Sequence, residues 1–205
     1  MEHIDYEIIR CESLKTTEWS GGTTTEICIH PENSRYADRN FGFRISSALV
    51  ADDESTFTLL PGYKRHIMPL VGNMHLTHEN RHEVELKPFD KDFFHGDWVT
   101  KSKGKCMDFN LMLSDEFEGS IDPVKSGDLE VFGADGFFGF YILADCKAMV
   151  TQGSEMKEET LGKGDFLAFP FIDNQSNKMY QVKLVAQAGN DVNTVKVIVK
   201  NKQCS

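Results

Sequence analysis

Hydrophobic and polar residues alternate in short segments along most of this chain, and sustained helical periodicity is almost absent. The segments FGFRISSALV (41–50), MDFNLML (107–113) and TVKVIVKN (194–201) show the alternation clearly. A period of two places successive side chains on opposite faces of a strand. Glycine, proline, asparagine and aspartate separate these segments, as expected for close turns. The pattern therefore predicts an all-β chain, built as an antiparallel sandwich or barrel.

Two stretches, 67–94 and 140–169, share one order of features: strand, turn, strand, short break, aspartate, paired apolar residues. Such self-similarity indicates a repeated unit. The second copy ends in GDFLAFP (164–170), which resembles the second half of the cupin signature. This resemblance suggests a double-stranded β-helix fold with two cupin-like (RmlC-like jelly-roll) barrels in one chain, a bicupin.

We expect the first barrel to span 1–115 and the second 116–205, with the option that the termini exchange strands between barrels. The segment 114–136 (SDEFEGSIDPVKSGDLEVFGADG) is rich in glycine and aspartate and contains a proline, so it is expected to form the junction. The acidic stretch ADDES (51–55) is expected to form a loop.

The string HENRH (78–82) matches the H-E-x-x-H pattern of zinc hydrolases letter by letter. That chemistry requires both histidines on one face of a helix. The flanking segments NMHLT and EVELKP alternate with period two, and Asn80 is central to a probable turn. The context therefore favours an exposed, polar hairpin tip over a metalloprotease site.

Metal ligation of the usual cupin kind is not expected either. His75 and His78 are three residues apart, so on a strand they point to opposite faces. His66 and His95 are candidates by spacing, but no acidic residue completes the set. All seven histidines lie at or before residue 95, which leaves the second barrel without an imidazole ligand. We therefore expect no metal and no other cofactor.

Composition narrows the class of protein and its partners. Acidic residues outnumber basic ones, 32 to 22, for a formal net charge of −10. Such a chain repels phosphate backbones, so nucleic acid is not an expected partner. The N-terminal segment has no signal-peptide character and the longest apolar run is too short for a bilayer, so we expect a cytoplasmic protein without membrane contact. The five cysteines are scattered and are expected to be reduced thiols.

Residues 16–27 (TTEWSGGTTTEI) combine a tryptophan, paired glycines, a threonine run and a glutamate. Gly21 and Gly22 permit close approach of the backbone, and the polar residues beside them supply hydrogen-bonding groups for a small ligand. The alternative is a β-bulge at the start of a strand, with Trp19 filling the core. The residues alone leave both interpretations open.

Two strands carry a polar face. In FRISSA, Arg44 and Ser46 share one side of the strand; in MDFNLML, Asp108 and Asn110 do so. If both faces point into one barrel, they form a pocket in which arginine suits a carboxylate ligand. The alternatives are a structural ion pair between Arg44 and Asp108, or plain exposure to solvent.

The motifs WSGGTTTE, FRISSALV, STFTLLPGYKR, LKPFDKDFFHGDW and DFNLML follow one another over about residues 15–113. In this combination the chain resembles the HutD/Ves family of bacterial bicupin proteins. The family's tryptophan motif is closer to W-x-N-G-G-G-x-T-x-E-I. The version here is two residues shorter and lacks the asparagine, so it is similar to a shorter-motif branch of the family.

The resemblance implies a cytoplasmic bicupin without the usual cupin metal ligands. It also implies, for some members, a link to histidine utilisation through a pathway acid such as formylglutamate or urocanate, and for others a link to stress or cold. By matching position it implies ten pocket residues: Trp19, Gly21, Gly22, Thr25, Glu26, Arg44, Ser46, His66, Asp108 and Asn110.

The function expected from these observations is binding of a small carboxylate metabolite in the first barrel, held by Arg44, with a regulatory or buffering role. No catalytic residue is assigned. The alternative is a cupin-type isomerase, epimerase or hydrolase in which Glu26 and His66 exchange protons. A third possibility is an interaction scaffold whose first barrel is filled by its own side chains. The sequence also allows a homodimer.

Overall fold

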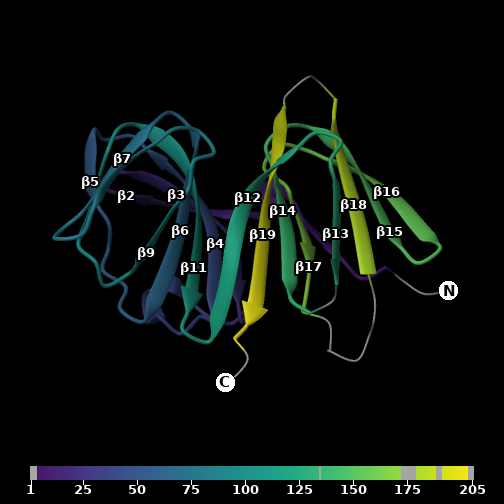
Figure 1. The fold of residues 1–205 in the computed structure, drawn as a ribbon, viewed down its shortest axis with the longest axis horizontal. Coiled ribbons are helices and arrows are strands. Elements are labelled where there is room, and N and C mark those ends of the chain that lie inside the picture. Colours follow the sequence, from purple (N-terminus) through teal and green to yellow (C-terminus); the bar gives the residue numbers. More distant parts are fainter. Residues whose placement is uncertain (1–3, 134, 172–178, 188–190, 203–205) are drawn as a thin grey trace. The chain divides into compact units, whose positions relative to one another are not determined.

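The computed structural model describes residues 4–133, 135–171, 179–187 and 191–202. It divides these residues into two compact units. One contains Leu14–Glu118 together with Lys202, and is called barrel 1 below. The other contains 4–13 and Gly119–Asn201, and is called barrel 2. Figure 1 shows that both consist of strands.

Barrel 1 has two antiparallel sheets. The six-stranded sheet runs in the order β2-β3-β4-β11-β6-β9 and the four-stranded sheet in the order β5-β10-β7-β8. Their strands are β2 (Lys15–Trp19), β3 (Gly22–His30), β4 (Phe43–Val50), β5 (Glu54–Thr56), β6 (Tyr63–Val71), β7 (Met74–His78), β8 (Glu83–Leu86), β9 (Asp92–His95), β10 (Thr100–Lys103) and β11 (Cys106–Ser114). A single 3-10 turn, η2 (Tyr36–Asp38), lies between β3 and β4.

Barrel 2 repeats this design with sheets ordered β1-β17-β14-β19-β12 and β13-β18-β15-β16. Its elements are β1 (Glu7–Ile9), η1 (Cys11–Ser13), β12 (Phe117–Lys125), β13 (Leu129–Gly133), β14 (Phe137–Ile142), β15 (Cys146–Gln152), β16 (Glu155–Leu161), β17 (Phe166–Phe169), β18 (Met179–Ala186) and β19 (Val192–Asn201). Strand β12 begins at the last residues of barrel 1.

The internal repeat is confirmed. In the first copy β7 pairs with β8 and β6 pairs with β9; in the second, β15 pairs with β16 and β14 with β17. Each hairpin thus sits in one sheet, while the strands before and after it pair in the other. This is the double-stranded β-helix arrangement expected from the sequence.

Alternation of apolar residues explains the cores. Barrel 2 buries a cluster that includes Phe140, Val150, Leu167 and Val182, all at 0% exposure. The buried residues of barrel 1 include a cluster around Ile67, Leu76 and Phe94 and another around Phe41 and Tyr63. Burying apolar surface of this kind is the main force that closes each pair of sheets.

The boundary between the two units, between Glu118 and Gly119, lies within 114–136, the segment expected to form the junction. This segment also contains β12 and β13, because Phe117, Ile121 and Val124 are buried in spite of the glycines and aspartates between them. The prediction of a loop at ADDES is wrong in part. In the acidic stretch ADDES, β5 begins at Glu54 and pairs with β10.

The N-terminal segment belongs to barrel 2. Strand β1 pairs with β17, with Ile8 opposite Leu167, and Ile4 is fully buried in the same core. The observed units differ from the expected ranges in three places: residues 4–13 belong to barrel 2, Lys202 belongs to barrel 1, and the boundary follows Glu118 where 115 was expected. Within the described residues, the structure contains no helix long and apolar enough to span a membrane.

Candidate functional site

The polar faces of β4 and β11 point to the same side of the six-stranded sheet. In the antiparallel register Ser46 lies opposite Asn110, and Ala48 lies opposite Asp108. Glu26 of β3 lies opposite Ser46 on its other flank. This face lines a cavity of about 930 Å³ in barrel 1, whose walls include Arg44, Ser46, Asp108 and Asn110. These four are among the six predicted site residues that line the cavity; the other two are Trp19 and Gly21.

Arg44 is buried and already has an anionic partner. Its Nε donates a hydrogen bond to Glu26 Oε2 at 2.7 Å, and its Nη1 donates to Ser46 Oγ at 3.2 Å. The guanidinium also lies over the ring of Tyr36, 4.5 Å from the centroid. The ion pair considered between Arg44 and Asp108 is therefore wrong: the partner of Arg44 is Glu26.

Arg65 is a second buried arginine on the same face, and the sequence reasoning assigned it no role. It lies opposite Met112 of β11, one step from Asn110 along the inner face. Among the described residues its guanidinium donates hydrogen bonds only to Asn110 Oδ1, at 3.3 and 3.4 Å. The rings of Phe57 and Phe94 lie 4.6 and 5.3 Å from its central carbon.

The charge of Arg65 is only partly compensated. Burial lowers the pKa of Arg65 to about 10, Asp108 opposes this, and the nearby charge of Arg44 adds to it. The group is still cationic at neutral pH. Two buried guanidinium groups that repel each other beside a cavity create a place where an anion is stabilised.

Asp108 is the buried acid of this face. Its side chain is 1% exposed, and its Oδ1 has no hydrogen-bond partner among the described residues. Burial raises the pKa of Asp108 to about 6, although Arg65, Asn110 and the backbone of Ala48 act in the opposite direction. Asp108 can therefore change its protonation state near neutral pH and can donate a hydrogen bond when protonated.

The WSGGTTTE segment forms the β2–β3 hairpin, and only part of it reaches the cavity. Trp19 and Gly21 line the wall together with Thr24. Trp19 is 38% exposed, so the alternative of a core-filling tryptophan is wrong. Thr25 hydrogen-bonds to Thr16 on the other face, so it does not line the cavity. The only bulge in β3 lies between Glu26 and Cys28, away from the strand start.

Gly22 has a structural reason of its own. A Cβ at this position would lie 1.9 Å from the carbonyl oxygen of Leu49. The glycine thus lets β3 approach β4 at the start of their pairing. It is not among the residues that line the cavity.

His66 lies outside the site. Its partner in the register is Leu111, so its side chain is on the face opposite Arg65 and Asn110. There its ring lies 4.8 Å from that of Phe93. The acid–base pair considered between Glu26 and His66 is therefore wrong, because the sheet separates the two side chains.

The HENRH string forms a hairpin tip, as predicted, but the expectation of an exposed tip is wrong for His78. The His78 side chain is completely buried, whereas that of His82 is 44% exposed. Both rings face Asp92, at the start of β9. His75 lies on the opposite face of β7, as the spacing predicts, and pairs with Glu83 and Glu85.

With this geometry established, a sequence comparison identifies the relatives. A model of the HutD family matches residues 11–188. The chain belongs to the HutD family. The match covers the β2–β3 hairpin, all four polar strand positions and most of barrel 2, so membership extends beyond the motifs of the first half.

Solved structures share the fold over nearly the whole chain. A conserved protein of unknown function, PA5104 from Pseudomonas aeruginosa PAO1, is 19% identical to this chain, with a TM-score of 0.80. The aligned region covers 97% of this chain and 100% of that one. HutD from Pseudomonas fluorescens SBW25, in a formate condition, is 21% identical with a TM-score of 0.73 and the same coverage.

Oxalate decarboxylase from Bacillus subtilis is a more distant relative in structure. It is 7% identical to this chain, with a TM-score of 0.67, and the aligned region covers 100% of this chain and 80% of the enzyme. At these identities the similarity concerns the fold, which is thereby established as that of a bicupin.

The alternation along β6 already indicated that Arg65 points to the inner face of the sheet. In YKRHI (63–67), Tyr63 and Ile67 are apolar and two steps apart on either side of Arg65, which places all three side chains on one face. The burial of alternate residues in β6 follows this phase. The positions of the aromatic rings of Tyr36 and Phe57 beside the two arginines could not be predicted from alternation, because Tyr36 belongs to the 3-10 turn η2 and Phe57 to a loop.

Proposed function

We propose that this protein binds a small carboxylate metabolite in the cavity of barrel 1. Its role is to regulate in response to this metabolite or to buffer the metabolite's concentration, and not to convert it chemically. The observation that carries the proposal is the environment of Arg65. This cation is buried and stacked on aromatic rings, and within the part of the chain that the structure describes its side chain hydrogen-bonds only to Asn110, over long distances. A carboxylate accepts two parallel hydrogen bonds from such a guanidinium group.

The two arginines would have different roles in ligand binding. Arg44 is paired with Glu26 at 2.7 Å, so its charge is largely satisfied in the free protein. Arg65 lacks such a close partner, so it is the better anchor, and Arg44 shapes the cavity beside it. This arrangement shifts the main role from Arg44, expected from the sequence, to Arg65.

Asp108 adds a dependence on pH. Its pKa of about 6 means that a carboxylate entering nearby favours the protonated form, which then donates a hydrogen bond to the ligand. Binding would therefore be accompanied by proton uptake near neutral pH. Affinity would be highest below pH 6 and would fall as Asp108 ionises.

Family membership supports a choice of ligands to test. The chain belongs to the family of the P. fluorescens protein named HutD, and we extend to this protein the proposed link to histidine utilisation. Formylglutamate and urocanate are small carboxylates that suit a cavity of about 930 Å³. A role in stress response is the other physiological setting that we propose for the same binding activity.

An enzymatic function is the second candidate, favoured by one observation. Asp108 is a buried acid with a pKa of about 6 that lines the cavity, as proton-transfer residues often are. A cupin-type isomerase, epimerase or hydrolase would thus use Asp108. Prolonged incubation of each ligand with the protein, followed by chromatography, would reveal a product in that case.

A thermal-shift screen tests the binding proposal. Formylglutamate, urocanate, glutamate and formate are added to the native protein, each beside its neutral amide. A ligand at 100 times its Kd stabilises the folded state by about 2.7 kcal/mol, which raises Tm by about 5–11 °C for a chain of this length. We expect such a shift for at least one acid and none for its amide. Equal shifts for acid and amide, or none for any acid, would contradict the proposal.

A further inference from the structure

Three side chains that could ligate a metal meet at the tip of the β7–β8 hairpin, and the proposed function makes no use of them. They are His78, His82 and Asp92. His78 Nε2 lies 2.8 Å from Asp92 Oδ2, and His82 Nε2 lies 3.6 Å from Asp92 Oδ1. One ligand atom from each of the three residues lies within 4.8 Å of the others.

The turn explains why histidines four residues apart meet without a helix. The amide of His78 donates to the carbonyl of His82 at 2.9 Å, and the amide of Arg81 donates to the carbonyl of His78 at 2.9 Å. Asn80 has a φ of 59°, in the left-handed region that closes such a tight turn. The two histidines are thus opposite each other at the hairpin end, with ring centroids 4.6 Å apart.

Asp92 comes from the other sheet. It begins β9 and lies opposite Ile67 of β6 in the six-stranded sheet, whereas His78 ends β7 of the four-stranded sheet and His82 lies in the turn just before β8. Its carboxylate directs one oxygen toward each imidazole. Ligand atoms around a tetrahedral zinc ion are about 3.3 Å apart when the bonds are about 2.0 Å long. The two nitrogen–oxygen separations, 2.8 Å to Asp92 Oδ2 and 3.6 Å to Asp92 Oδ1, lie on either side of this value. One ligand atom from each residue lies within 4.8 Å of the others, so binding requires a small inward movement, which His82 can make because its side chain is partly exposed.

The buried histidine is already oriented by a supporting group. His78 Nδ1 lies 2.9 Å from Thr100 Oγ1, and that hydroxyl donates to the carbonyl of Trp98 at 3.4 Å. The hydroxyl therefore accepts the proton of Nδ1, which leaves Nε2 as the metal-binding nitrogen. The rings of Phe94 and Trp98 lie 4.8 and 5.6 Å from the imidazole and hold its plane.

We propose that His78, His82 and Asp92 form a site for a divalent transition-metal ion, zinc being the best match, that fastens the two sheets of barrel 1 together. Two imidazoles and one carboxylate are a common ligand set for zinc and similar ions. The partial exposure of His82 leaves room for water as a further ligand. The role is structural, because one metal ion joins the tip of β7–β8 to the start of β9.

Zinc titration of the chelator-treated protein tests this site. The protein is stripped with EDTA and dialysed, and zinc is then added in competition with a chromophoric chelator. We expect one zinc ion per chain and a higher Tm with zinc. His82→Ala and Asp92→Asn should each weaken binding at least about 10-fold, because even residues that only support a ligand contribute 10- to 100-fold.

His75→Ala is the matched control. His75 is on the same strand, is partly exposed and pairs with two glutamates on the opposite face, so its loss should leave zinc affinity unchanged. Cobalt gives a second measurement: absorption bands of the bound ion should appear with the native protein and be lost with His82→Ala. The proposal is overturned if zinc binding is not saturable at one ion per chain, or if His82→Ala binds as tightly as the native protein.

Discussion

Asp108 connects the chemistry of the cavity with the stability of the protein. Its carboxyl is buried, and burial raises its pKa to about 6, against an ordinary value of 3.8. A raised pKa in the folded state means that the folded protein binds a proton more tightly than the unfolded chain does. The stabilisation from this proton is complete below about pH 4 and is lost as pH rises through 6.

Asp108→Asn should remove this dependence, because asparagine resembles the neutral acid in shape and cannot ionise. Relative to the variant, the native protein should gain about 3 kcal/mol of unfolding free energy between pH 8 and pH 4, since each pKa unit corresponds to about 1.4 kcal/mol. Urea unfolding of both proteins at the two pH values measures the difference. A constant difference between native protein and variant at both pH values would refute the raised pKa.

At the level of elements, the β2–β3 hairpin shows how a glycine serves strand pairing. Gly21 and Gly22 follow one another, but a Cβ at Gly21 would meet the ring of Trp19 at 2.2 Å, whereas one at Gly22 would meet the backbone oxygen of Leu49 at 1.9 Å. A partly exposed tryptophan ring can move aside. A paired backbone carbonyl cannot, unless the ladder between β3 and β4 opens.

Gly22→Ala is therefore expected to destabilise the protein by about 3 kcal/mol or more, the range of overpacking combined with backbone strain. Gly21→Ala is expected to cost less and to change the fluorescence of Trp19 by displacing its ring. Thermal unfolding and tryptophan emission distinguish the two effects. Similar losses of stability in both variants would show that the approach of β3 to β4 is not the constraint described.

The alternation of residues along β4 and β11 predicted which side chains share a face, because successive side chains of a strand point to opposite faces of the sheet. It thereby placed Arg44 with Ser46, and Asp108 with Asn110. The same rule applied to β6 also separates Arg65 from His66. It could not predict that Arg44 pairs with Glu26, because that contact depends on the register between β3 and β4. Nor could it predict the burial of His78, which comes from the distant residues Asp92 and Thr100.

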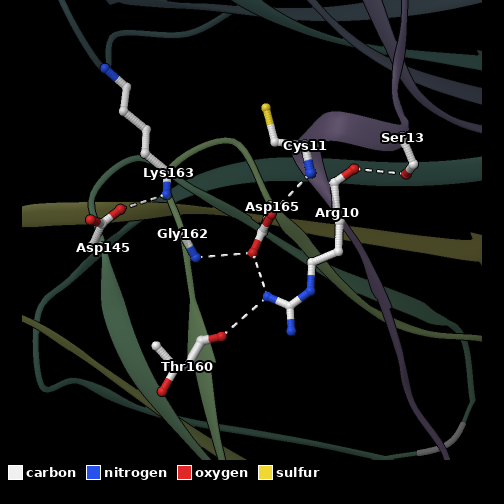
Figure 2. A network of polar contacts seen from close by, with 8 residues as sticks. All are labelled: Arg10, Cys11, Ser13, Asp145, Thr160, Gly162, Lys163 and Asp165. Carbon is white, nitrogen blue, oxygen red and sulfur yellow. Dashed lines mark hydrogen bonds and ion pairs between the residues drawn. The ribbon is translucent and has the colours of Figure 1, made fainter.

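At the scale of the whole molecule, the start of the chain and the cupin-like turn near its end form one polar network (Figure 2). Asp165, in the GDFLAFP motif, accepts hydrogen bonds from the amides of Cys11 and Gly162 at 2.9 Å, and Arg10 Nη1 donates to it at 2.7 Å. Burial opposes ionisation of Asp165, but these contacts outweigh it and lower its pKa. The motif residue thus anchors the N-terminal segment to barrel 2.

Asp165→Asn should destabilise barrel 2 by about 2–4 kcal/mol, because a buried acceptor of three hydrogen bonds loses its charge. The lowered pKa implies that this stabilisation is present at neutral pH and is lost as pH falls below the ordinary value of 3.8. Asp145→Asn is the control in the same network, since the Asp145 side chain accepts one hydrogen bond, from the backbone amide of Lys163. Denaturant unfolding at pH 7 should show a clear loss for the first variant and about 1 kcal/mol or less for the second. Equal losses would contradict the anchoring role.

The bicupin fold was predictable from the sequence because turn chemistry and alternation act locally and recur in both halves. That residues 4–13 belong to barrel 2 could not be predicted in this way. It depends on the pairing of β1 with β17 and on Arg10 meeting Asp165, contacts that span more than 150 positions. Local patterns carry no information about such partners.

The proposed function depends on the binding of a carboxylate through Arg65 in the cavity of barrel 1. Isothermal titration calorimetry with the best acid from the screen tests it most directly, on the native protein, Arg65→Lys and the control Arg35→Lys, whose side chain is exposed. Lysine keeps the charge but loses the two parallel hydrogen bonds, so Arg65→Lys should bind about 100-fold more weakly while Arg35→Lys matches the native protein. Native affinity in Arg65→Lys, with its fold intact by circular dichroism, would contradict the claim.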